Sequence, residues 1–313
     1  MRSICIPLLG LLLICHHVHG QNVAYCIGNS LTNDSRPQYL EDSLWHVYCG
    51  KNLDYIFNNP QGHCISTSTP WPDALSDNQF EYISVQPFNG TTLEQDRDII
   101  AYWMTLQPQA KFVIHSGWTA HATFVDDYLA GNPDNMMRPS PEYMQDLIAA
   151  LNEIFPDRLI IQTHANDLLY SVWQEIEMAN NPKIIDLEPK WFVQLPYDEL
   201  SDIYRDPVHL DLDAGRYLMH NALRYAFGQP LFPRELFPNL TGIETTYIEY
   251  VIRESLVIPG DANRDRIVNL ADVEPFVDSL TSDEFEITTD MNEDREINLL
   301  DIGPFIDAVL KSP

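Results

Sequence analysis

The sequence V-A-Y-C-I-G-N-S-L-T spans Val23 to Thr32, and this stretch decides the fold that we predict. Its first five residues form a short apolar run that suits a buried strand. Gly28, Asn29 and Ser30 then interrupt the run, and both Gly and Asn tolerate the backbone angles of a tight turn. A serine just past a strand end can stand clear of the sheet as a nucleophile, with backbone N–H groups nearby. The same residues also fit an ordinary strand and turn in which Ser30 caps a helix.

The length and composition indicate a globular protein with an acidic surface. The chain has 313 residues, enough for one mid-sized domain and a small second one. Its 45% hydrophobic content argues for a real core and against global disorder. The formal net charge of -28 repels phosphate backbones, so nucleic acid is not an expected partner.

The first twenty residues have the pattern of an export signal. Arg2 supplies a positive start, residues 4–15 are an apolar run, and Val18 and Gly20 put small residues before a cleavage point. The run is too short for a typical membrane span, and no later stretch is long and apolar enough for one. We therefore expect cleavage after Gly20, with a lipoprotein cut before Cys15 as the alternative, and a secreted or periplasmic protein.

Three cysteines follow this leader, namely Cys26, Cys49 and Cys64. An odd count in an exported protein allows at most one internal disulfide and leaves one thiol. Cys49–Cys64 is the pair that we favour, with Cys26 buried in the first strand, although the sequence alone does not show this.

Strand and helix patterns alternate after Ser30. We predict strands at residues 80–85, 111–115 and 158–162, with a short one at 63–68, and helices at 37–48, 92–106, 140–154 and 213–227. This alternation predicts an α/β fold, a parallel sheet with helices on both faces and a site at the carboxyl ends of the strands. Ser30, Gln86, His115 and Thr163 fall near such ends. Residues 243–256 fit either a strand or a short helix.

A second motif supplies partners for a nucleophilic serine. Asp206 and His209 lie three residues apart in D-P-V-H, and Pro207 disfavours a helix there. One loop can thus carry a base and the carboxylate that orients it, and the order Ser, Asp, His is that of α/β hydrolases. The alternative is a helix-entry loop with a capping Asp.

With both motifs in hand, residues 22–227 resemble the GDSL/SGNH hydrolase family. Gly28-Asn29-Ser30-Leu31 is similar to its first motif, with Asn29 where Asp is commoner, and D-x-x-H is similar to its last. The resemblance implies a flavodoxin-like three-layer sandwich, with Ser30 as nucleophile, His209 as base and Asp206 as orienter.

The chain departs from that family in its oxyanion hole. The usual Gly-x-Asn-Asp block is missing after the strand at 111–115, where the sequence is Ser116-Gly117-Trp118. Gln86 or Asn89 could supply an amide donor instead, beside the Ser30 N–H. The same cleft could be lined by His115, Trp118, His164 and Asn166, for which packing at strand ends is an equally good interpretation.

The C-terminus contains an internal repeat of a twelve-residue pattern with oxygen-bearing side chains, and the copies begin 29 positions apart. Each copy is followed by an amphipathic helix. Side-chain oxygens at positions 1, 3, 5, 9 and 12, with a backbone carbonyl at 7, are what Ca²⁺ needs. The expected ligands are Asp261, Asn263, Asp265, Ile267, Asn269 and Asp272 in the first loop, and Asp290, Asn292, Asp294, Glu296, Asn298 and Asp301 in the second.

The repeat resembles a type I dockerin, an EF-hand-like all-α domain that holds two Ca²⁺ ions and binds cohesin modules. Position 6, usually Gly, is Arg266 in one loop and Arg295 in the other, and this demands an unfavourable backbone angle. We accordingly divide the chain into a signal peptide (1–20), a hydrolase-like domain (21–229), a boundary region (230–256) and a dockerin-like domain (257–313).

Two functions compete at this point. The first is an exported esterase that acts on acetyl or similar esters of polysaccharides and needs no cofactor for catalysis. The second is an inactive hydrolase-fold binding or scaffold protein anchored through its dockerin-like module. A lipase is a weaker third option because no apolar lid is evident.

Overall fold

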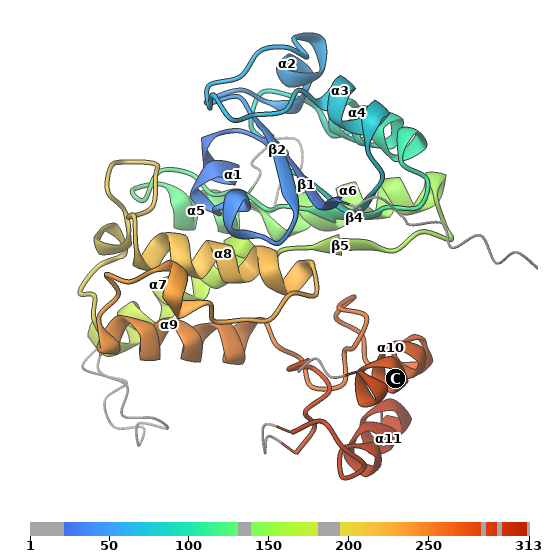
Figure 1. Ribbon diagram of the computed structural model, residues 1–313. Coiled ribbons are helices and arrows are strands. Elements are labelled where there is room, and N and C mark those ends of the chain that lie inside the picture. The colour runs from blue at the N-terminus through green and yellow to red at the C-terminus, as the bar shows by residue number, and fades with distance from the viewer. Residues whose placement is uncertain (1–21, 131–138, 181–194, 283–285, 293–295, 312–313) are drawn as a thin grey trace, which may run out of the picture.

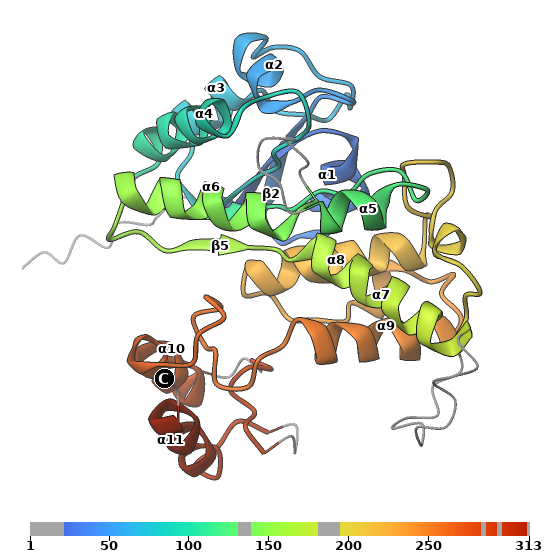
Figure 2. The same cartoon turned by 180° about the vertical axis from the view of Figure 1, so that it is seen from behind.

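A five-stranded parallel sheet forms the centre of the larger domain. The computed structural model describes residues 22–130, 139–180, 195–282, 286–292 and 296–311, so the predicted leader lies outside it. The strand order is β2-β1-β3-β4-β5, and all four pairings are parallel. Figures 1 and 2 show helices on both faces of this sheet. The domain is therefore a three-layer α/β sandwich whose strand order is that of the flavodoxin-like class.

The five strands are buried on both faces, as a parallel sheet requires. Along β1, Tyr25 and Ile27 face one helical layer, while Ala24 and Cys26 face the other. The strands are β1 (Asn22–Gly28), β2 (Ser43–Val47), β3 (Phe80–Val85), β4 (Lys111–Ile114) and β5 (Ile160–Gln162).

Two groups of helices cover the sheet. One face packs against α2 (Leu53–Asn58), α3 (Trp71–Asp77), α4 (Leu93–Leu106) and α6 (Pro141–Ile154). The other face packs against α8 (Ala214–Ala226). The outer side of α8 packs in turn against α7 (Ala165–Asn180) and α9 (Gly242–Ser255). The short helices α1 (Ser30–Asp34) and α5 (Phe124–Leu129) contribute to the same hydrophobic cluster. Single 3₁₀ turns occur at η1 (Pro37–Tyr39), η3 (Leu200–Ile203) and η4 (Arg234–Leu236).

Most of the predicted elements are confirmed, and two are wrong. The helix predicted at 37–48 is a single 3₁₀ turn followed by strand β2. Arg36 and Asp42 adopt positive φ angles of 56° and 41°, which end any helix, and β2 then gains a full set of partners beside β1. The strand predicted at 63–68 is an irregular loop, which the Cys49–Cys64 disulfide ties to the end of β2.

The favoured disulfide is therefore present, and Cys26 is a buried free thiol. The ambiguous stretch at 243–256 is helix α9, which begins with a capping box between Thr241 and Glu244. The buried face of α9 packs against α7 and α8, so this helix belongs to the core of the α/β domain.

A small helical module follows at the C-terminus, below the α/β domain in Figure 1. It contains η5 (Leu270–Asp272), α10 (Val273–Thr281) and α11 (Ile302–Lys311). Phe276 and Phe305, one from each repeat, stack with ring centroids 3.8 Å apart and form the centre of its core with Ala262. In the described ranges no helix combines the length and apolar character that a bilayer crossing needs.

Candidate active site

Ser30 lies at the carboxyl edge of the sheet, as the first residue of α1 immediately after β1. Asn29 caps this helix, because its side chain accepts a hydrogen bond from Leu31 N at 2.9 Å. Gly28 is required at the strand end, since an added Cβ would lie 2.1 Å from Thr32 Oγ1 and 2.8 Å from Gln86 Cβ. Ser30 itself is half-buried, and its N–H has no acceptor among the described residues. The turn thus presents both a hydroxyl and a free backbone donor.

Gln86 directly follows β3, and its side chain is hydrogen-bonded to the start of α1. Its Oε1 accepts hydrogen bonds from Thr32 N at 3.0 Å, Thr32 Oγ1 at 2.6 Å and Asn29 N at 3.4 Å. Its Nε2 is buried without a hydrogen-bond acceptor in the described chain and points toward Gly117. Gln86 therefore has an amide NH₂ group without an acceptor in the described chain next to α1, but that group is enclosed. Asn89 lies three residues further on, half-exposed, in the loop after β3.

The D-x-x-H loop is assembled as the spacing suggested. His209 Nδ1 lies 3.0 Å from both carboxylate oxygens of Asp206. The same carboxylate accepts the backbone N–H groups of Val208 at 3.0 Å and His209 at 2.8 Å. These hydrogen bonds, chiefly that of the His209 backbone, lower the pKa of Asp206 to about 2. A carboxylate bound to Nδ1–H leaves Nε2 as the basic nitrogen of the imidazole.

The contact expected between Ser30 and His209 is not formed. Ser30 and His209 both lie within the described ranges, yet no hydrogen bond joins Ser30 Oγ to the imidazole. Catalytic hydrogen bonds are often long without substrate and shorten in the Michaelis complex. The structure therefore shows an imidazole bound to Asp206 and a turn that presents Ser30, without a hydrogen bond between the two.

The four other residues expected at the cleft differ in their roles. His115 is fully buried between Ser35 Oγ at 2.7 Å and Thr163 Oγ1 at 2.9 Å, and burial lowers its pKa to about 3. Asn166 is buried too and donates to Pro139 O at 2.6 Å. Both side chains thus stabilise the packing of strand ends.

Trp118 and His164 have contacts that bear more directly on the site. Trp118 Nε1 donates to Val208 O at 2.9 Å and so braces the loop that carries His209. His164 Nδ1 lies 2.6 Å from Asp167 Oδ2, with a left-handed backbone at φ 54°. This second His–Asp pair was not predicted, although the H-x-x-D of His164 and Asp167 mirrors the spacing of D-x-x-H.

The first predicted calcium loop is closed by hydrogen bonds of its own. Asp272 accepts the N–H groups of Asn263 at 3.0 Å and Asn269 at 2.8 Å, and Asp261 accepts that of Arg266 at 3.0 Å. Arg266 has the predicted left-handed backbone, with φ 68°. Burial, together with the nearby carboxylates, raises the pKa of Asp261 to about 6. Asp261 Oδ1 is buried without a hydrogen-bond donor from the described chain, so a cation fits this donor set.

The second loop is partly outside the described residues, including Asp294. Asp301 occupies the position of Asp272 and makes the matching bonds, from Asn292 N at 3.2 Å and Asn298 N at 2.8 Å. Within the described ranges no three His, Cys, Asp or Glu side chains converge as a metal cluster. A cluster of that kind contains only His, Cys, Asp and Glu side chains. The predicted calcium ligands also include Asn oxygens and the backbone carbonyls of Ile267 and Glu296, so its absence does not test them.

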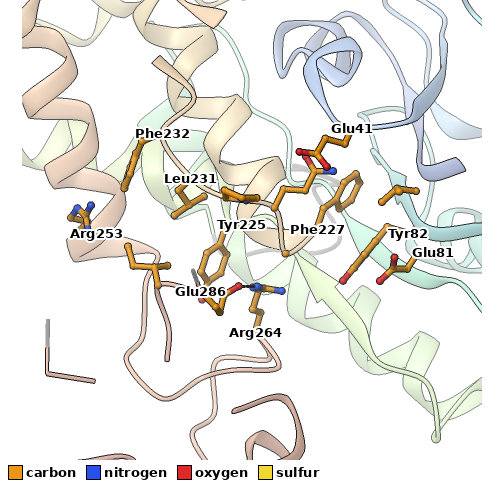
Figure 3. A pocket seen from close by; sticks show the side chains of 15 residues that line it. Glu41, Glu81, Tyr82, Tyr225, Phe227, Leu231, Phe232, Arg253, Arg264 and Glu286 are labelled. Atoms are coloured by element: carbon orange, nitrogen blue, oxygen red, sulfur yellow. Dashed lines mark hydrogen bonds and ion pairs between the residues drawn. The ribbon is translucent and has the colours of Figure 1, made fainter. Parts of the chain in front are cut away.

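A cavity of about 460 Å³ lies between the α/β domain and the C-terminal module. Val23 and Tyr82, which line it, stand at the amino ends of β1 and β3, opposite the edge that carries Ser30. Figure 3 shows Tyr225 beside the ion pair of Arg264 and Glu286 on the module side. This cavity therefore lies where the two domains meet, away from the sheet edge that carries Ser30.

Comparisons with known proteins leave the family open. No family model matches the chain, and no curated protein matches it. A DUF4886 family protein from Bacteroides uniformis is similar at 16% identity with a TM-score of 0.45, covering 75% of this chain and 94% of that one. A member of the lipolytic protein G-D-S-L family from Veillonella parvula is similar at 13% identity with a TM-score of 0.36, covering 69% and 98%. Likenesses this distant carry no functional argument.

Proposed function

We propose that the chain is an exported serine ester hydrolase. The observation that carries this proposal is the Asp206–His209 pair, an imidazole oriented by a carboxylate at 3.0 Å. Its loop contacts Trp118, shortly after β4, and Asp34 on the same helix as Ser30. An oriented base with a free Nε2 is what a serine hydroxyl needs to become a nucleophile. The N-terminal leader of residues 1–20 supports the proposal of export.

In the proposed reaction, Ser30 Oγ attacks the ester carbonyl carbon while His209 Nε2 takes the hydroxyl proton. The tetrahedral oxyanion accepts the Ser30 N–H, with an amide of Gln86 or Asn89 as the second donor. Collapse of this intermediate expels the alcohol, which takes the proton back from His209. Water then hydrolyses the acyl-Ser30 ester, with His209 as base again, while Asp206 stays ionised throughout.

The C-terminal module supports a more specific substrate proposal. Its two loops resemble those of dockerins, and we propose that each binds one Ca²⁺ ion and that the folded module docks onto a cohesin-type partner. A module of this kind would hold the enzyme among proteins that act on polymers. Acetyl or similar esters on polysaccharides are therefore the substrates that we favour.

Hydrolysis of p-nitrophenyl acetate tests the enzymatic proposal. Wild type, Ser30→Ala and His209→Asn would be compared with Ser76→Ala, which removes an exposed hydroxyl on α3. We expect both site variants to lose at least about 10³-fold in kcat, and Ser76→Ala to retain wild-type turnover. Equal rates for wild type and Ser30→Ala would end the esterase proposal.

A non-catalytic scaffold protein is the second candidate. Two observations favour it: Ser30 Oγ is not hydrogen-bonded to the described His209 ring, and Gln86 Nε2 is enclosed. On this proposal the module anchors a hydrolase fold that binds without turning over. Wild-type protein that is inert toward both p-nitrophenyl acetate and a fluorophosphonate probe of reactive serines would favour it.

Calcium binding is tested on the full chain with the metal alone. After chelation, CaCl₂ should increase the helical circular dichroism, with half-saturation in the range of about 10⁻⁷ to 10⁻³ M. Asp261→Asn should weaken that response at least about tenfold. Asp278→Asn, on the exposed side of α10, is the matched control and should behave as wild type. A circular dichroism spectrum that CaCl₂ leaves unchanged would refute the calcium proposal.

A further inference from the structure

Asp34 is a buried carboxylate one helical turn beyond Ser30. It lies at the end of α1, and its side chain is 0% exposed. Residues four apart in a helix lie on the same face, so α1 carries the nucleophile at one end and this charge at the other. A buried carboxylate needs both countercharge and hydrogen bonds.

Two arginines from distant parts of the chain supply both. Arg205 Nη1 donates to the two Asp34 oxygens at 3.1 and 3.2 Å. Arg216, near the start of α8, donates to Asp34 Oδ1 through Nε at 3.2 Å and Nη2 at 2.9 Å. The anion is thus held from two sides, by one nitrogen of Arg205 that reaches both oxygens and by two nitrogens of Arg216 that reach the same oxygen.

Arg205 also closes the loop of residues 205–210 that carries His209, which we call the base loop. Its N–H donates to His209 O at 3.0 Å, and Nη1 donates to Leu210 O in addition to Asp34. Tyr204 and Leu210 form an antiparallel bridge at the root of the same loop. Asp34 therefore contacts, through one side chain, the loop that positions His209.

We infer that Asp34 is a positioning residue, which fixes the distance between Ser30 on α1 and His209 on its loop through Arg205 and Arg216. The inference rests on the proposed serine mechanism for its catalytic consequence. Because the two catalytic side chains are not hydrogen-bonded to each other, their separation depends on what joins their supports. The Asp34 clamp, defined as Asp34 with Arg205 and Arg216, is a direct connection of this kind between α1 and the loop that carries His209.

Asp34→Asn tests the clamp, because it keeps the shape of the side chain and removes the charge that holds both arginines. Glu249→Gln is the matched control: Glu249 on α9 is also a mostly buried carboxylate, held by Arg234 at 2.6 Å and by Tyr217, but it touches no part of the base loop. Deuterium exchange of the amides in residues 205–210 is measured in the full chain. We expect exchange at least about tenfold faster in Asp34→Asn and unchanged in Glu249→Gln.

The same variants are assayed with p-nitrophenyl acetate. A displacement of about 1 Å between reacting groups can lower the rate about 100-fold, so kcat should fall by that factor in Asp34→Asn, with KM within about threefold of wild type. Where Asp34→Asn does not fold, Arg205→Met replaces it, since a methionine side chain has no N–H group to donate to Asp34 or to the Leu210 carbonyl.

Exchange that Asp34→Asn leaves unaltered overturns the clamp, whether or not the chain is an enzyme. Equal acceleration in Asp34→Asn and Glu249→Gln also overturns it, because the loop would then respond to the loss of any buried ion pair. If Ser30→Ala is inactive and Asp34→Asn keeps wild-type kcat, the positioning role fails while the proposed hydrolase stands. If Ser30→Ala hydrolyses p-nitrophenyl acetate at the wild-type rate, the hydrolase proposal is refuted, and the deuterium-exchange result alone tests the clamp.

Discussion

Replacing Asp206 by asparagine separates the two tasks of this carboxylate. Asn can still accept the N–H groups of Val208 and His209 through its carbonyl oxygen, so the turn of the loop is kept. Its NH₂ group would face His209 Nδ1, and the ring would then have to accept at Nδ1 and carry its proton on Nε2. An imidazole protonated at Nε2 cannot take the proton of Ser30.

The magnitude follows from these contacts. Loss of the correct tautomer lowers kcat by about 10⁴-fold in buried triads. The Asp206 side chain is 42% exposed, so water can replace part of its effect, and we expect a fall of about 10³-fold. Asp206→Ala removes the turn as well, and should also lower the free energy of unfolding by about 1 kcal/mol.

The assay combines steady-state hydrolysis of p-nitrophenyl acetate with urea unfolding of the same preparations. Asp202→Asn is the control, because Asp202 also accepts two backbone N–H groups, at 2.9 and 3.1 Å, but has no histidine partner in the described chain. Its kcat should match wild type. Asp206→Asn with kcat within about threefold of wild type would refute the assignment of Asp206 as the orienter of His209.

Three further predictions concern stability. Burial lowers the pKa of His115 and of His220 to about 3, below the unfolded value near 6.5, so the unfolded chain binds more protons. The free energy of unfolding should therefore fall as pH drops from 6.5 toward 3, by up to about 1.4 kcal/mol per pH unit for each ring. Urea unfolding at pH 7, 6 and 5 measures this, and a free energy of unfolding that does not change with pH would contradict it. Phe276→Ala should destabilise the C-terminal module by about 3–5 kcal/mol, so the module should melt separately from the α/β domain in calorimetry; a single unchanged transition would count against it. Reducing the Cys49–Cys64 bond, which closes a loop of 15 residues, should lower the free energy of unfolding by about 3 kcal/mol, and unchanged urea midpoints with and without reductant would argue otherwise.

Features that depend on near neighbours were predictable from the sequence. The apolar run before Gly28 indicated β1, and the three-residue spacing of Asp206 and His209 indicated their contact, because both depend on a few adjacent residues. The alternation of strands and helices predicted the parallel sheet with helices on both faces. The left-handed angle at Arg266 followed from its position in the loop pattern.

Errors occurred where the tertiary context outweighed the local pattern. Residues 37–48 have helical spacing of apolar side chains, yet residues 43–47 become β2 because strand β1 offers a full row of hydrogen-bond partners. For Gln86, a predicted oxyanion donor, the tertiary structure adds a contact that no local pattern indicated: its carbonyl oxygen accepts the N–H groups at the start of α1. The donor role of its amide stays a prediction.

The sequence by itself therefore determined the turn at Ser30, the Asp206–His209 loop and the first acidic loop, since each is formed within about a dozen residues. Only the tertiary structure decided how the first two are held relative to each other. Asp34 meets Arg205 across 171 positions of the chain and Arg216 across 182, and no local pattern marks such partners. A buried charge is stable only where the fold brings opposite charges to it, so this connection between Ser30 and His209 exists only once the chain has folded.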